Sequence, residues 1–152
     1  MIIFIVLVKI YGSSSLSNSA SAFEWEKQVS VYFVDLKKAE TSNCEASMPL
    51  KRTVPNAETL GPGAVVMLLK GLTPDEREFY YYAINQDVLL QKFEIKNRVA
   101  YVDFNSNLNQ GVAGSCNVIA IRSQIENTLN NLPDIDSTVI SINGQTEGIL
   151  EP

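Results

Sequence analysis

The fold is decided by residues 114–144, which read GSCNVIAIRSQIENTLNNLPDIDSTVISING. Apolar side chains recur there at steps of three or four, which predicts a helix with one buried face. These side chains are Val118, Ile121, Ile125, Leu129 and Leu132. The polar residues of the same stretch are assigned to the other faces, namely Arg122, Gln124, Glu126, Asn127 and Asn130. We expect Ser115 to cap the helix and Pro133 to stop it, because a residue before proline is pushed out of the helical conformation.

The remaining elements follow from the periodicity of the chain on either side. Residues 138–143 alternate apolar and polar side chains, which predicts a strand with a core face. Upstream we expect a strand at 29–35, a helix at 64–70 with Pro62 in its first turn, one helical turn near 73–79, and a hairpin of 89–96 and 99–104. The hairpin's first strand would turn Leu89, Gln91, Phe93 and Ile95 to one side. Residues 37–54 lack a period and are interpreted as a long loop, with a short edge strand at 51–54.

This order of elements is strand, helix, strand, strand, helix, strand. It predicts an α/β (α+β) domain, a small mixed sheet with two helices on one face.

Composition excludes several classes of function. The chain has 152 residues, 45% of them hydrophobic and 19% charged, which is typical of one globular domain. A net charge of -5 does not indicate the basic surface that nucleic-acid binding requires. The sequence contains no histidine, which removes His-based catalytic triads and most zinc sites. We expect no metal site.

The amino-terminal segment has features of a membrane anchor or a signal segment. Residues 1–8 are wholly apolar, but a helix of that length covers only about 12 Å of a hydrocarbon core about 30 Å thick. We interpret residues 1–11 as a membrane anchor or a truncated signal segment, 12–27 as a Ser-rich linker, and 28–152 as the folded domain. A cleaved signal peptide and a buried amino-terminal strand are the alternatives.

Seven short motifs follow one another along the chain: VYF at 31–33, RTV at 52–54, LLKGLT at 68–73, VAYVDF at 99–104, AGSC at 113–116, IENTL at 125–129 and VISING at 139–144. In this order and spacing they resemble the GerMN domain of spore-germination and other bacterial envelope proteins. The match covers about residues 29–151. Leu72 stands where the family usually has proline, and Gly61-Pro62-Gly63 interrupts the expected first helix.

The resemblance implies a compact α/β domain, similar to the ring-building domains of sporulation machinery, placed outside the cytoplasmic membrane and without catalysis or cofactor. It carries over no functional residues, and Arg52 and Asp103 are interpreted as structural.

The two cysteines, Cys44 and Cys116, predict one disulfide if the domain lies outside the cytoplasm. It would join the long loop to the start of the 115–132 helix. Two separate buried thiols are the alternative, and a nucleophilic role lacks a histidine to activate either sulfur.

Two further groups are weighed as sites. Tyr80, Tyr81 and Tyr82 are a possible binding surface, because successive side chains of an extended segment face opposite ways. Core packing is their other use. Asp103, Asp134 and Asp136 could suggest acid and base or calcium ligands, but the 134–136 loop lacks the other oxygen ligands and the glycine of a calcium loop. We interpret all three as structural.

The sequence therefore predicts a non-enzymatic extracytoplasmic module that binds an envelope protein or its own kind. A domain that binds cell-wall glycan or peptide through the tyrosines is the second hypothesis, and an enzyme dependent on Asp103 is the third.

Overall fold

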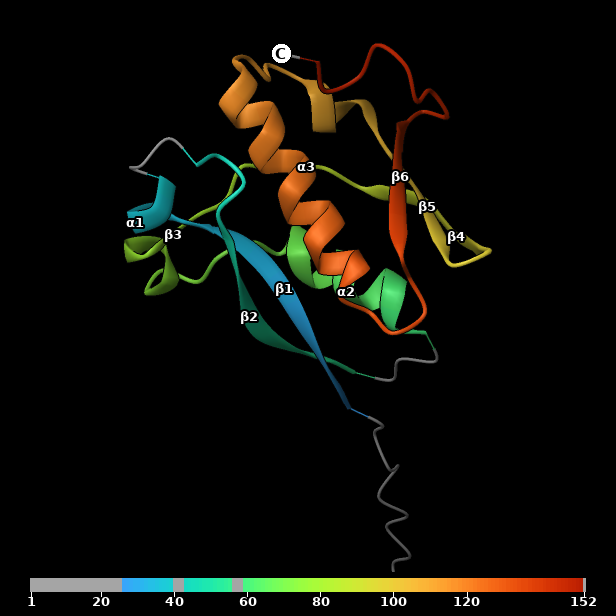
Figure 1. Cartoon of the computed structure of the whole chain (residues 1–152), viewed down its shortest axis with the longest axis horizontal. Coiled ribbons are helices and arrows are strands. Elements are labelled where there is room, and N and C mark those ends of the chain that lie inside the picture. The colour runs from blue at the N-terminus through green and yellow to red at the C-terminus, as the bar shows by residue number, and fades with distance from the viewer. Residues whose placement is uncertain (1–25, 40–42, 56–58, 152) are drawn as a thin grey trace, which may run out of the picture.

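The computed structural model describes residues 26–39, 43–55 and 59–151. It is a mixed α/β domain, as the sequence predicts, but its strands form two three-stranded sheets rather than one (Figure 1). The first sheet has the order β2-β1-β3 and the second β4-β5-β6. The strands are β1 (Lys27–Asp35), β2 (Ser47–Val54), β3 (Tyr80–Tyr81), β4 (Leu90–Lys96), β5 (Val99–Phe104) and β6 (Ser137–Ile142).

Two of the three described helices, α2 and α3, lie against both sheets. The three helices are α1 (Leu36–Ala39), α2 (Leu60–Leu69) and α3 (Ser115–Asn130), with single 3-10 turns at η1 (Glu76–Glu78) and η2 (Ser106–Asn109). α2 and α3 pack on each other and on β1 and β2, while α3 also reaches β6 and α2 reaches β4. The two sheets therefore share one apolar core through these helices, to which β1, β5, α2 and α3 contribute most of the fully buried side chains.

The 114–144 stretch folds largely as expected. Its apolar stripe is buried from Val118 to Leu132, and β6 runs parallel to β5, with Ile140 and Ile142 in the core. A parallel neighbour needs a long crossover, which α3 provides. The predicted cap is wrong, because Gly114 takes the N-cap position with a φ of 84°, and no side chain caps the helix. A residue other than glycine rarely adopts that backbone conformation, so Ser115 becomes the first helical residue.

The short edge strand expected at 51–54 is present, but the loop predicted before it is wrong from residue 47 on. Residues 47–54 form β2, an eight-residue edge strand paired along almost the whole of β1. Half of its side chains are polar and only Val54 is buried, so the apolar period that reveals a buried strand is missing. Pro49 is tolerated because an edge strand has one side on which no backbone N–H is needed.

The hairpin is present, but β4 does not turn the expected side chains inward. A register shift between Leu90 and Lys92 breaks the alternation, so Leu90 and Phe93 pack on the core while Leu89 and Ile95 are exposed. Asn97 and Arg98 form the turn with φ values of 50° and 64°, as a tight hairpin requires.

The two segments assigned before residue 28 lie outside the described residues, apart from 26 and 27. Within the described part of the chain, no helix is long and apolar enough to cross a membrane.

α2 contains Gly61, Pro62 and Gly63 without interruption, beginning at Leu60. The absence of side chains at both glycines permits close packing, since a Cβ on Gly61 would collide with the ring of Phe93 and one on Gly63 with Val54. The glycines thus seat α2 between β2 and β4.

We predict that Gly61→Ala destabilises the domain by about 1–3 kcal/mol, because overpacking outweighs the higher helix propensity of alanine. Val66→Ala, on the exposed side of the same helix, should stay within about 0.5 kcal/mol. Urea unfolding of both variants measures the difference. A Gly61→Ala variant as stable as the parent would contradict the packing account.

Candidate functional site

The tyrosine segment borders a hollow of about 810 Å³. Its walls are β3 with residues 82–87, the carboxyl-terminal end of α2 with residues 70–72, and Asn117 in the first turn of α3. We call this the tyrosine hollow.

The three tyrosines have different surroundings. Tyr82 is largely buried: its ring lies 5.9 Å from that of Phe33, and burial raises the pKa of its hydroxyl. Tyr80 is half-buried, and Tyr81 is 47% exposed. Tyr82 is therefore a core residue, whereas Tyr81 presents its ring to solvent.

A buried amide on α3 fixes the backbone of this segment. Gln124 is fully buried, and its side chain donates to the carbonyl of Tyr81 at 2.8 Å and accepts from the N–H of Ala83 at 3.2 Å. The assignment of Gln124 to an outer face of the helix is therefore wrong. One turn later, the fully buried Thr128 accepts from the N–H of Tyr32 at 3.0 Å. Both polar residues lie on the buried side with Ile121 and Ile125, which is the signal that sequence reasoning passed over.

The far wall of the hollow is anchored by asparagines. The side chain of Asn85 donates to the carbonyls of Asn107 and Gln110, at 2.9 and 2.6 Å. Asn105 and Asn107 in turn donate to the carbonyl of Asp87. Hydrogen bonds between side-chain amides and backbone carbonyls thus hold this segment in place, while the side chains of Gln86 and Asp87 are exposed.

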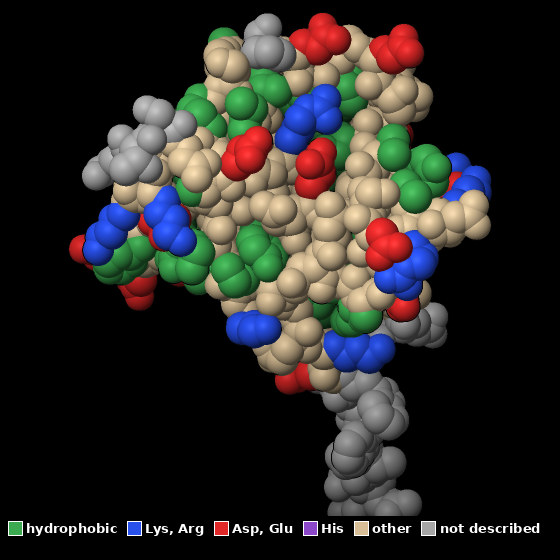
Figure 2. Space-filling model, in the orientation of Figure 1, with side chains coloured by type: hydrophobic (Ala, Val, Ile, Leu, Met, Phe, Trp, Pro, Cys, Tyr) green, Lys and Arg blue, Asp and Glu red, His purple; other side chains and the backbone are tan. Residues whose placement is uncertain are grey.

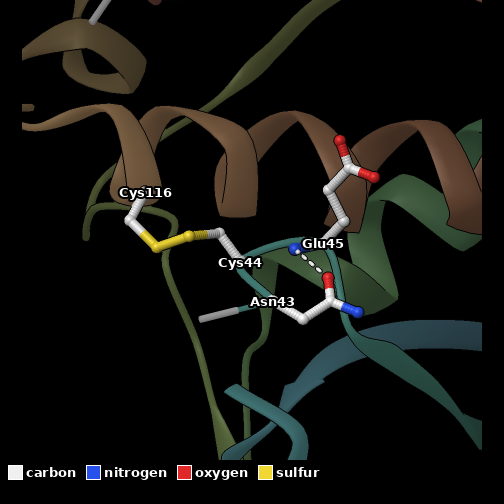
Figure 3. The surroundings of a disulfide bond; sticks show 4 residues. All are labelled: Asn43, Cys44, Glu45 and Cys116. Atoms are coloured by element: carbon white, nitrogen blue, oxygen red, sulfur yellow. Dashed lines mark hydrogen bonds between the residues drawn. A yellow bond between two sulfur atoms is a disulfide. The ribbon is translucent and has the colours of Figure 1, made fainter. Parts of the chain in front are cut away.

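The structure contains a disulfide between Cys44 and Cys116, with Cα atoms 5.2 Å apart (Figure 3). It ties the segment before β2 to the first turn of α3, beside Asn117. Figure 3 also shows the side chain of Asn43 accepting from the N–H of Glu45 at 3.2 Å, which shapes this segment. The disulfide thus fixes the end of α3 that borders the hollow.

Comparison with known proteins identifies the family. The family model Germane, described as "Sporulation and spore germination", matches residues 30–148. The chain belongs to the Germane family. Among proteins with curated descriptions, none matches.

Three solved structures share the fold of this Germane domain. The tandem GerMN domains of the Bacillus subtilis sporulation protein GerM align with a TM-score of 0.59 and 20% identity, over 80% of this chain and 40% of that one. The first GerMN domain of GerM gives 0.56 and 18%, over 79% and 85%. A candidate lipoprotein from Clostridium perfringens gives 0.53 and 19%, over 82% and 80%. The resemblance to the GerMN domain drawn from the sequence is confirmed.

Two of the three carboxylates considered for catalysis, Asp103 and Asp136, have structural partners in the Germane domain. One oxygen of Asp103 accepts from the hydroxyl of Ser141 at 2.6 Å and from the N–H of Gly144 at 2.7 Å, so it secures the turn after β6. Asp136 forms a two-point ion pair with Arg98 in the hairpin turn, both distances being 2.7 Å, which lowers the pKa of Asp136. Asp134 is exposed in the loop between α3 and β6, which also contains Asp136.

Arg52 is structural as well. It pairs with Glu76 at 2.6 Å and lies 5.6 Å from the ring centre of Phe33. Burial alone would raise the pKa of Glu76, but hydrogen bonds from Arg52 and from the N–H of Thr73 outweigh it and hold the pKa below its ordinary value. Among the described residues, no three acidic or cysteine side chains are grouped to hold a metal ion.

We predict that Gln124→Leu lowers the free energy of unfolding by about 2–4 kcal/mol, because it leaves the Tyr81 carbonyl and the Ala83 N–H without partners. Gln145→Leu, at an exposed glutamine, is the matched control and should change little. Chemical denaturation compares the two. Equal stability of the two variants would show that the buried amide does not hold β3.

We predict that Cys44 and Cys116 resist alkylation in the folded chain until a reductant is added. Replacing both with serine should lower the free energy of unfolding by about 4 kcal/mol, because the bond closes a long loop in the unfolded chain. Mass spectrometry before and after reduction measures the first effect, and denaturation the second. Cys116 is exposed, so labelling of the unreduced folded chain would refute the bond.

Proposed function

We propose that this chain is a non-enzymatic binding module of the bacterial cell envelope, anchored outside the cytoplasmic membrane or secreted, which acts by contact with another envelope protein or with a second copy of itself. The membership of the Germane family carries the proposal. The shared fold with GerMN domains of GerM and with a candidate lipoprotein supports the envelope location. The disulfide supports it independently, because such bonds persist in oxidising compartments.

The absence of catalysis is part of the same proposal. Asp103 and Asp136, the carboxylates that chemistry would first recruit, already accept strong hydrogen bonds from groups that hold the fold together. A general acid or base must be free to exchange a proton with substrate. Binding therefore explains the arrangement better than reaction.

Exposed apolar side chains around β3 offer a contact surface. Leu36, Phe79 and Tyr81 are 36%, 51% and 47% exposed, and the N–H of Leu36 bonds to the carbonyl of Phe79, which places the first two side by side. On the face shown in Figure 2, charges of both signs are interspersed and hydrophobic side chains form small separate patches. Such a surface suits a partner with mixed polarity rather than nucleic acid.

Binding of cell-wall material at the tyrosine hollow is the second candidate function. The observation that favours it is the hollow itself, with the exposed ring of Tyr81 on its rim and unused polar groups around it.

Two measurements on the full chain separate these functions. We expect sedimentation velocity to show self-association or capture of an envelope protein that Phe79→Glu weakens, because a charge opposes apolar contact. Leu89→Glu, at an exposed leucine away from β3, should have no effect. Pelleting with purified cell wall tests the second function. A chain that remains monomeric, retains no envelope protein and does not pellet with wall contradicts both.

A further inference from the structure

The tyrosine hollow contains a polar group whose partner is missing. The side-chain oxygen of Asn117 is buried and has no hydrogen-bond partner among the described residues. A buried acceptor without a donor costs stability, so native proteins rarely keep one without a reason. Asn117 lines the hollow, and the terminal torsion of an asparagine is broad, so its amide can turn the oxygen toward a donor placed there.

Other polar side chains around the hollow are also unused. Within the described chain, none of them makes a hydrogen bond or ion pair: Lys70, Arg77, Tyr80, Tyr81, Gln86 and Asp87. Together they offer donors and acceptors on rigid walls, because Gln124 and Asn85 have already fixed the backbone behind them. A preformed site of this kind loses little entropy on binding.

The chemistry of the lining favours a sugar. Two cations and one carboxylate leave no strong preference for an anion, whereas hydroxyl and amide groups match the paired donor and acceptor character of sugar hydroxyls. The exposed ring of Tyr81 can cover the apolar C–H face of a pyranose, as an amphipathic aromatic does at wet sites. The volume of about 810 Å³ lies in the range of small-ligand sites and would hold a short oligosaccharide.

A peptide that adds a strand fits this place less well. Such a ligand needs free backbone groups at a sheet edge. At β3 the carbonyl of Tyr81 and the N–H of Ala83 are both engaged by Gln124, so this part of the edge is closed from within.

We propose that the tyrosine hollow binds the N-acetylated glycan strand of the cell wall, with the ring of Tyr81 on a sugar face and the amide oxygen of Asn117 accepting a sugar O–H or N–H. This inference rests on the second function proposed above. It adds the ligand class and the residue, Asn117, that gives the hollow its selectivity for a donor.

Calorimetric titration of the full chain with a soluble hexamer of β-1,4-linked N-acetylglucosamine tests the proposal. We expect binding that Tyr81→Ala weakens by about tenfold or more, which corresponds to about 1.4 kcal/mol. Asn117→Ala should weaken it similarly while leaving the melting temperature unchanged or higher, because it removes an unsatisfied acceptor. Tyr101→Ala, at a tyrosine 42% exposed on β5 and outside the hollow, is the matched control and should bind normally.

Three results would overturn the proposal. The first is the absence of any heat of binding when the hexamer is titrated into the chain. The second is equal affinity for the hexamer in the parent, Tyr81→Ala and Asn117→Ala. The third is displacement of the hexamer by a soluble wall stem peptide that binds more tightly. Pelleting with whole cell wall distinguishes failure of the hollow as a glycan site from failure of cell-wall binding as a function. If Tyr81→Ala and Asn117→Ala still pellet like the parent, wall binding survives and the hollow is not its site.

Discussion

The rest of the structure depends on two fully buried polar side chains of α3, Gln124 and Thr128. β3 has only two residues, so it cannot cover the long edge of β1. Thr128 takes the N–H of Tyr32 that β3 does not reach, and Gln124 holds the chain where β3 ends. A helix thereby completes the edge of a sheet, which keeps buried backbone groups satisfied and protects the edge from other chains.

Around the tyrosine hollow, the backbone is held by hydrogen bonds while several side chains remain free to bind a ligand. The backbone is committed to Gln124 and to the asparagines of the η2 region, while the disulfide secures the first turn of α3 on the opposite wall. Rigid walls with free side chains are what a binding site needs, because little ordering remains to be done when a ligand arrives. The stability of the fold and the shape of the hollow therefore come from the same contacts.

Sequence patterns correctly predict the buried face of a helix or strand where the positions of its apolar residues alone determine that face. The stripe from Val118 to Leu129 and the alternation through β5 are of this kind, and both are buried as expected. Patterns fail where a distant partner decides. Gln124 is buried because backbone groups some forty residues away need it, and β2 is a strand because β1 pairs with it. The division into two sheets, likewise, is set by long-range pairing that no local period reveals.

The candidate site was accessible from sequence only in part, for the same reason. A run of three tyrosines predicts that at least one ring is exposed, and Tyr81 meets this expectation, whereas nothing local marks Tyr82 as the one that packs on Phe33. Asn117 gave no signal at all. Its significance lies in what is missing around it, a donor for a buried oxygen, and that can be seen only once every neighbour has been placed. Gln124 and Thr128 are recognised as structural by the hydrogen bonds they make, whereas Asn117 is recognised as a candidate binding residue because its oxygen has no donor among the described residues.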